Sequence, residues 1–314
     1  MTNGVVAGQP LAPGWTGKLW ALHQGLQYAQ TLTPPPDYLL LTDADIEHDA
    51  LNLRCLVAKA QQEDLDLVSL MVRLRCESFW EKLLIPAFVF FFQKLNPFPW
   101  VNDPTKPTAA AAGGCILITR EALTRIGGIE VVRDALIDDC ALAQAVKSTR
   151  FTQFPHKEDK GERKDKGENT SSSPKIWLGL TDSTQSLRPY PSLSTIWDMV
   201  ARTAFTQLNY SFGLLIVTVM GMILIYIVPP VCAIFGLLTG NSLVAIAGLS
   251  TWLLMAYAYL PTIRFYGCSP PLALCLPGIA LLYTLMTVDS AVRHWQKRGG
   301  TWKGRVYSKT IKAD

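Results

Sequence analysis

Two carboxylates one residue apart, Asp43 and Asp45, follow directly on a short apolar run over 38–41. The run is continuous and Pro34-Pro35-Pro36 precede it, which predicts a buried strand. Ligands of open α/β sheets bind at the carboxyl ends of the strands, so both side chains are expected at that edge. Two carboxylates this close repel each other unless a cation lies beside them, and a hard divalent ion on a phosphate-bearing substrate is the natural partner. The alternative is a strand that ends in a solvated acidic turn.

A second acidic pair, Asp138 and Asp139, stands at the predicted start of a helix. Aspartate is a common N-cap residue, so Asp138 is expected to cap that helix. In a chain that already carries the pair near residue 44, the second carboxylate is better explained by a site than by capping alone.

A lysine and a glycine pair could complete a phosphate or sugar site. Lys18 opens a predicted helix over 18–30, where it either meets a phosphate or lies on the surface. Gly113 and Gly114 end a run of small residues that leads into a strand predicted up to residue 119. Small residues let another backbone or a sugar approach closely.

The elements that must position these residues alternate between strand and helix patterns. Predicted strands cover 38–41, 65–74, 115–119 and 177–180, and predicted helices cover 18–30, 50–63, 122–128 and a stretch from 138. This alternation predicts a charged α/β domain in the first 200 residues.

The last hundred residues contain long uncharged apolar runs, over 212–238, 243–260 and 270–287. The first exceeds the roughly 20 residues needed to cross a bilayer core, and buried core helices are the weaker alternative. We expect about three membrane segments, with a kink at Pro229-Pro230. With the α/β domain in the cytosol, the basic tail over 293–312 would fall outside, against the preference of Lys and Arg for the cytoplasmic side. The third segment is therefore re-entrant, or another segment pairs with it.

Two further features lie beside the apolar runs. The stretch 79–100 has a short apolar centre, Pro86 and flanking aromatic residues, which favours a helix in the headgroup layer; an amphipathic core helix is the alternative. Arg202 lies on a predicted helix over 192–208, just before the first membrane segment. Its side chain could extend to lipid headgroups or hold a diphosphate.

Composition excludes several classes of protein. The net charge of +4 is too small to indicate nucleic-acid binding, and seven scattered cysteines without a Cys-x-x-Cys pair argue against a disulfide framework or a zinc site. The polar, charge-balanced stretch up to residue 175 predicts a disordered insert.

Taken together, these pieces resemble family 2 glycosyltransferases with a GT-A fold. More narrowly, the phrases GWTGKLWA (14–21), LLLTDADIEH (39–48), IDDCALA (137–143) and LRPYPSLSTIWDMVARTAFTQL (187–208) resemble the bacterial hopene-associated glycosyltransferases, relatives of the ceramide glucosyltransferases. The resemblance implies a GT-A-like, Rossmann-like nucleotide-sugar domain followed by a C-terminal helical transmembrane region. It implies a nucleotide-sugar donor such as a UDP-sugar, a membrane lipid acceptor, and a multi-pass protein of the inner (cytoplasmic) membrane with its catalytic domain in the cytoplasm.

The resemblance also implies roles for individual residues. Asp43 and Asp45 would hold Mg²⁺ or Mn²⁺ on the donor diphosphate, and Asp139 would be the catalytic base. The donor side of the site would further include Lys18, Gly114, Asp138 and Arg202. Arg202 stands near the place of the family's Gln/Arg-x-x-Arg-Trp motif, from which this sequence departs.

The front of the chain departs more strongly, since the family's first membrane anchor and first strand have no counterpart here. We therefore expect a domain that is incomplete at its N-terminus. The expected parts are a partial glycosyltransferase domain (1–150), a disordered insert (151–175), the membrane-proximal end of the catalytic domain (176–211), transmembrane helices (212–290) and a basic tail (291–314). The sequence leaves open an inactive, truncated membrane protein of the same family and, more weakly, a small transporter.

Overall fold

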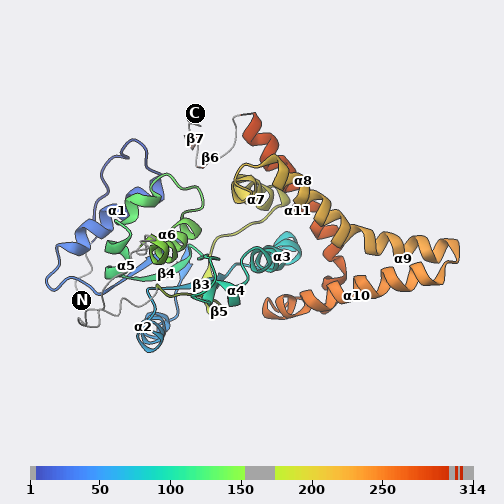
Figure 1. The fold of residues 1–314 in the computed structure, drawn as a ribbon, viewed down its shortest axis with the longest axis horizontal. Helices are drawn as coiled ribbons and strands as arrows, with labels where there is room; N and C mark the ends of the chain where they lie inside the picture. Colours follow the sequence, from blue (N-terminus) through green and yellow to red (C-terminus); the bar gives the residue numbers. More distant parts are fainter. Residues whose placement is uncertain (1–4, 153–173, 297–300, 303–304, 307–314) are drawn as a thin grey trace, which may run out of the picture. The chain divides into compact units, whose positions relative to one another are not determined.

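The computed structural model describes residues 5–152, 174–296, 301–302 and 305–306 (Figure 1). Most of the predicted insert (151–175) and most of the predicted basic tail (291–314) lie outside the described residues. The chain divides into two compact units, the first formed by 1–73 and 96–186 and the second by 74–95 and 187–314. Each unit is described by itself below.

The first unit is built on a mixed five-stranded sheet with the order β1-β4-β3-β5-β2. Its strands are β1 (Tyr38–Thr42), β2 (Ile46–Glu47), β3 (Leu67–Arg73), β4 (Cys115–Thr119) and β5 (Ile176–Ser186). β4 is antiparallel to both β1 and β3, whereas β3 and β5 are parallel. The predicted α/β class is confirmed.

The prediction that the strand before Asp43 is buried was wrong. β1 pairs only with β4 and therefore forms an edge of the sheet, and Leu41 is its one buried residue. The central strand β3 is the buried one, with every residue from Leu67 to Val72 buried. A short apolar run does not distinguish the two positions, because edge and centre differ in their neighbours and not in their own residue types.

Helices pack around this sheet. They are α1 (Gly17–Gln30), α2 (Asn52–Glu63), α4 (Phe98–Asn102), α5 (Arg120–Arg125), the 3₁₀ turn η1 (Ile129–Val132) and α6 (Asp138–Thr152). Lys147 of α6 is buried, and its ammonium group donates hydrogen bonds to the carbonyls of Trp100, Val101 and Thr108 at 3.3, 2.7 and 2.6 Å. These bonds satisfy the buried amine. They also fix α6 against α4 and against the segment that leads to Gly113.

The second unit is helical. It contains α3 (Phe79–Leu95), α7 (Leu193–Gln207), α8 (Phe212–Met222), the π-helical turn η2 (Ile223–Ile227), α9 (Val228–Thr239), α10 (Ser242–Phe265), the 3₁₀ turn η3 (Pro270–Cys275) and α11 (Leu276–Trp295), with the short strands β6 (Thr301–Trp302) and β7 (Arg305–Val306). Three continuous helical stretches, Phe212–Thr239, Ser242–Phe265 and Pro270–Trp295, are long and apolar enough to cross a membrane. They coincide with the three predicted segments. α7, predicted at the membrane-proximal end of the catalytic domain, groups with this unit.

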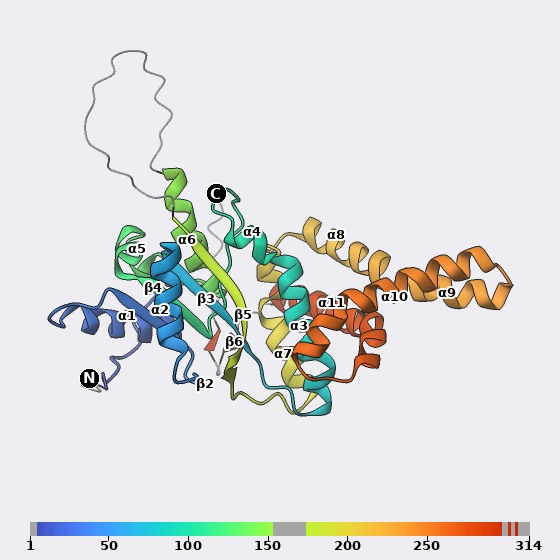
Figure 2. The same ribbon diagram turned by 90° about the horizontal axis from the view of Figure 1, so that it is seen from below.

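The helices α9 and α10 form a hairpin with a close backbone contact (Figures 1 and 2). A Cβ atom on Gly236 would overlap the backbone of Ala245, and one on Gly248 would lie 2.6 Å from the carbonyl oxygen of Pro229. Small residues at a helix contact allow the two backbones to approach and gain van der Waals energy, which contributes to helix association in lipid.

Two proline predictions can be compared with the structure. Pro229 and Pro230 lie in the first turn of α9, directly after the π-helical turn η2 and within the continuous helical stretch Phe212–Thr239. α3, which contains Pro86, packs against α7, α10 and α11 of its own unit. Tyr283 donates a hydrogen bond to the carbonyl of Leu84 at 2.9 Å. This packing agrees with the alternative of a core helix, and placement of α3 in a headgroup layer stays a prediction.

Candidate active site

The strand pairing places two distant segments side by side. Because β1 and β4 are antiparallel, Thr42 at the end of β1 lies opposite Cys115 at the start of β4. Asp43 therefore leaves the sheet beside the Gly113-Gly114 pair, although 70 residues separate them in the sequence. The predicted position of Asp43 at the carboxyl end of a strand is confirmed.

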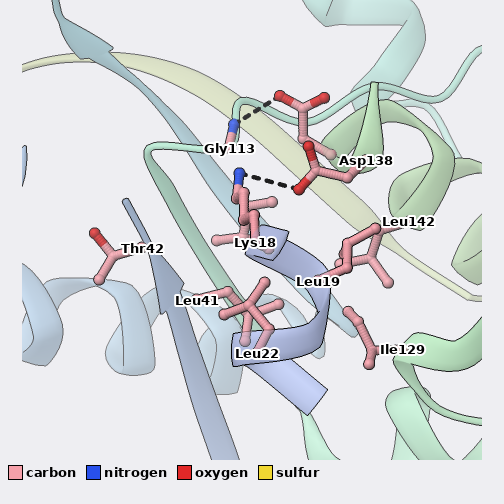
Figure 3. Close-up of a pocket in the computed structure, with 11 residues that line it drawn as sticks. Lys18, Leu19, Leu22, Leu41, Thr42, Gly113, Ile129, Asp138 and Leu142 are labelled. Carbon is pink, nitrogen blue, oxygen red and sulfur yellow. Dashed lines mark hydrogen bonds and ion pairs between the residues drawn. The ribbon is translucent and has the colours of Figure 1, made fainter. Parts of the chain in front are cut away.

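Lys18 contacts residues of both acidic motifs. The hydroxyl of Thr16 accepts a hydrogen bond from the Leu19 N–H and so caps α1, which places Lys18 in the first turn of that helix. The Lys18 ammonium nitrogen is 3.0 Å from an oxygen of Asp43 and 3.0 Å from an oxygen of Asp138. Figure 3 shows Lys18 and Asp138 pointing toward each other. The two acidic motifs of the sequence therefore belong to one site.

Asp139 is fixed by backbone amides on both of its carboxylate oxygens. Oδ2 accepts a hydrogen bond from the Gly113 N–H at 2.8 Å, and Oδ1 accepts one from the Cys140 N–H at 2.8 Å. The capping role predicted for Asp138 is not what the helix start shows: α6 begins at Asp138, whose carboxylate pairs with Lys18 instead. The bond to a first-turn amide of α6 is made by Asp139.

The charges in this cluster perturb each other. Burial, and then the negative charge of Asp138, raise the pKa of Asp139 to about 6, although Lys18 and the two amides act in the opposite direction. Burial alone would lower the pKa of Lys18, but the charges of Asp138, Asp43 and Asp139 together raise it above its ordinary value. A carboxylate poised near neutral pH beside a permanently charged lysine is the arrangement expected of a general base.

Gly113, rather than Gly114, is the glycine that faces the cluster. A Cβ atom on Gly113 would lie 2.9 Å from the Lys18 ammonium nitrogen and 3.2 Å from Asp139 Oδ2. A Cβ atom on Gly114 would instead meet Val72 at 2.9 Å and Ile46 at 3.3 Å, which are packing contacts. Sequence reasoning selected Gly114. The Gly-Gly dipeptide was the available signal, but it does not tell which glycine faces the site.

A hydrogen-bonded chain braces the turn that carries Asp43 and Asp45. The Asn52 amide bonds to Nδ1 of His48 at 2.9 Å, Nε2 of His48 lies 2.8 Å from the Thr42 hydroxyl, and that hydroxyl donates to the Gly114 carbonyl at 2.9 Å. With the proton of His48 on Nε2, each group donates to the next. His48 was missed from the sequence, because no spacing links it to the strand it supports.

The other predicted site residues lie as follows. Asp45 is half-buried in the turn between β1 and β2. Within the part of the chain that the structure describes, no group of three or more His, Cys, Asp or Glu side chains is arranged to hold a metal ion. Arg202 lies on α7, which belongs to the second unit.

A small pocket adjoins the cluster in the first unit (Figure 3). Lys18, Gly113, Asp138 and Asp139 supply its polar side. Its apolar side is formed by Leu19, Leu22, Leu41, Ile116, Ile129 and Leu142. Apolar walls exclude water and so strengthen the charge interactions beside them.

Comparison with known proteins identifies this domain. Residues 5–154 match the family model described as "Glycosyl transferase family 21", so they form a glycosyltransferase domain. The match supports the GT-A, ceramide glucosyltransferase-like family that the motifs predicted. A search of curated proteins found no match. Together with the three apolar helices, the domain supports a membrane glycosyltransferase.

The matched range contains every site residue predicted from the sequence except Arg202. It also contains Gly113 and His48, which the structure adds. The resemblance to the narrower hopene-associated group stays a prediction.

Proposed function

We propose that this protein transfers a sugar from a nucleotide-sugar donor, such as a UDP-sugar, to a lipid acceptor held in the bilayer. The observation that carries the proposal is the Lys18 cluster. One ammonium group bridges Asp43 and Asp138, beside a backbone-anchored Asp139, within the segment that matches a glycosyltransferase family. Three helices able to cross a membrane suit a substrate that lives in the bilayer.

Asp139 is the proposed general base. Both oxygens are held by amide donors, so the side chain cannot turn away from the pocket. A pKa raised to about 6 leaves the group ionised at neutral pH and still basic enough to accept the proton of an acceptor hydroxyl. A base without an evident nucleophile favours a single displacement at the sugar, and hence inversion of the anomeric centre.

The residues at the end of β1 fit a divalent cation. Asp43 and Asp45 are hard oxygen donors, and Mg²⁺ is commonly held by one or two carboxylates together with substrate phosphates. Mg²⁺ or Mn²⁺ bound there would neutralise the charge on the departing diphosphate. Lys18 places a further positive charge at this edge, 3.0 Å from Asp43, which supports a site for a diphosphate. Arg202 is a further candidate for the diphosphate, and hopanoid is the acceptor class that the sequence phrases favour.

The test is a transfer assay on membranes that contain the full chain. Membranes are incubated with labelled nucleotide sugars, with and without EDTA, and lipids are then extracted. Label in the lipid phase that EDTA abolishes and added Mg²⁺ or Mn²⁺ restores is the expected result. No labelled lipid with any donor would contradict the proposal and favour an inactive membrane protein. Retained anomeric configuration in the product would exclude the single displacement.

A further inference from the structure

Two thiols of the second unit lie within reach of each other. The sulfur atoms of Cys76 and Cys268 are 3.8 Å apart, although 192 residues separate them in the chain. Both side chains are half-buried thiols. We propose that Cys76 and Cys268 form a reversible disulfide under oxidising conditions, which clamps the segment over 74–78 onto the turn that follows α10.

The backbone fixes the position of Cys268. The Cys268 N–H donates to the Ile263 carbonyl at 3.0 Å, and the Gly267 N–H donates to the Arg264 carbonyl at 2.9 Å. Gly267 has a φ of +67°. This is the Schellman ending of a helix, in which a glycine in the left-handed conformation closes the last turn. The thiol therefore projects from a defined point and not from a loose loop.

A buried carboxylate fixes the segment that carries Cys76. One oxygen of Glu81, whose side chain is 0% exposed, accepts hydrogen bonds from the N–H groups of Glu77 and Ser78 at 2.9 and 2.8 Å. Its other oxygen accepts the Tyr190 N–H at 2.6 Å. The amides hold the pKa of Glu81 below its usual value even though burial acts in the opposite direction. Glu81 therefore fixes the backbone of the two residues that directly follow Cys76.

A direct contact also joins the two segments. The N–H of Leu74, two residues before Cys76, donates to the hydroxyl of Tyr266 at 3.4 Å. Tyr266 is the C-cap of α10 and lies two residues before Cys268. This bond joins the two segments two residues before each cysteine, and so holds the thiol-bearing residues near each other.

The chemistry requires an oxidant such as hydrogen peroxide. One thiolate attacks a peroxide oxygen, the O–O bond breaks, and the sulfur becomes a sulfenic acid while the other oxygen leaves as water. The second thiol then attacks that sulfur, the S–O bond breaks, and a second water leaves. Two thiols and one peroxide give one disulfide and two waters. The sulfur atoms must approach from 3.8 Å to about 2.0 Å for the bond to form.

The disulfide would restrain one of the chain segments that connect the two units. Residues 74–78 join the end of β3 to the start of α3, and so lead from the sheet of the first unit into the helices of the second. A disulfide to Cys268 would restrain this connection against α10. The proposal does not depend on the sugar-transfer reaction, because it is read directly from the covalent state of the cysteines.

The experiment uses membranes that contain the full chain. They are treated with graded hydrogen peroxide, the remaining thiols are blocked with N-ethylmaleimide, and the protein is digested without reduction for mass spectrometry. Wild type should lose two of its seven thiols first, and the linked peptides should contain Cys76 and Cys268. Dithiothreitol should restore both thiols. Cys76→Ser and Cys268→Ser should each abolish the link, whereas Cys55→Ser, a change at an exposed cysteine of α2, should leave it intact.

A second arm tests whether the folded structure brings the thiols together. Oxidation after unfolding in detergent should scatter the linkages among several cysteines. The proposal is overturned if Cys76 and Cys268 both stay alkylatable at doses that oxidise the exposed Cys55 and Cys275. It is also overturned if the folded protein yields the Cys76–Cys268 link no more often than the unfolded protein does.

Discussion

Each unit contains a cation that contacts two carboxylates, Lys18 in the first and Arg293 in the second, and the two cations are used differently. In the first unit Lys18 contacts Asp43 and Asp138. In the second unit Arg293 of α11 contacts Asp198 at 2.7 Å and Asp289 at 2.8 Å, and the indole N–H of Trp197 donates to Asp289 at 2.6 Å. In both clusters negative charge exceeds positive charge.

The difference between the clusters lies in the cation and in what surrounds it. The guanidinium group is a planar fork that directs separate N–H groups at two carboxylates, which suits a fixed clamp between α7 and α11. An ammonium group is a point charge that carboxylates or a phosphate can share. The Lys18 cluster contains a carboxylate with a raised pKa, and it adjoins a glycine whose Cβ would lie 2.9 Å from the ammonium nitrogen. The comparison teaches that a binding site is recognised by charged groups that a ligand can still share. In a structural clamp, the N–H groups of the cation already contact protein carboxylates.

Removal of the proposed base should have the largest effect. Asp139→Asn keeps the shape but cannot accept a proton, so sugar transfer should fall by about 10²–10⁴-fold. The matched change in the clamp, Asp289→Asn, should leave transfer within a factor of about two. Transfer is measured in membranes with labelled donor, and folding is monitored by thermal stability. If both variants lost transfer activity equally, Asp139 would have no special role compared with Asp289 of the clamp.

Removal of the lysine should weaken transfer and move its pH dependence. Lys18→Met should cost about 10²-fold, comparable to the loss of one donor that stabilises charge in a transition state. Transfer by the wild type should rise as the pH passes about 6, because Asp139 must be ionised to act as a base. The positive charge of Lys18 lowers the pKa of Asp139, so the variant's rise should occur at higher pH. Arg293→Met should not move the profile. If the pH profile of Lys18→Met coincides with that of the wild type, the charge of Lys18 does not influence the pKa of Asp139.

A single methyl group at Gly113 should disturb the first cluster by geometry alone. Gly113→Ala would place Cβ 2.9 Å from the Lys18 ammonium nitrogen and 3.2 Å from Asp139, so one of them must move. We expect a loss of roughly tenfold in transfer, since small misplacements of catalytic groups are costly. Gly25→Ala on α1 is the control, because its Cβ would meet nothing within 4 Å. Full activity of Gly113→Ala would show that the close approach is dispensable.

The smallest effect should come from the clamp itself. Arg293→Lys keeps the charge but loses the forked contact with Asp198 and Asp289. These side chains are 30–64% exposed, so the loss should be about 1 kcal/mol or less, seen as a small decrease in melting temperature with unchanged transfer. Charge reversal, Arg293→Glu, should lower the melting temperature further. Stability that is unchanged in both variants would mean that the clamp does not hold α7 to α11.

The fold was predictable where the evidence is local. Hydrophobic run lengths located the three apolar helical stretches, and alternating patterns located β1, β3, β4 and most helices of the first unit. The order of the strands was not predictable, since β4 inserts antiparallel between β1 and β3 through contacts between distant residues. That order decides which strand is buried, and for this reason β1 was assigned wrongly to the interior.

The candidate site was predictable in its acids and less so in its partners. Two Asp pairs in one α/β domain predicted a shared site, and the structure places Asp43 and Asp138 on the same ammonium group. The sequence placed Lys18 near a phosphate but could not show that it bridges the two pairs. His48 and Gly113 depend on which atoms face each other after folding, and neither the residue type nor the spacing carries that information.

Because α9 and α10 are in close contact, the two faces of these helices should differ in the substitutions they tolerate. Where Gly236 and Gly248 meet the opposite backbone, even alanine is too large, so that face tolerates almost no change in volume. The outward side chains, among them Leu238 at 81% and Leu243 at 80% exposure, have no such neighbour. Apolar substitutions there could adapt the hairpin to bilayers of different thickness or fluidity while its internal spacing stays constant.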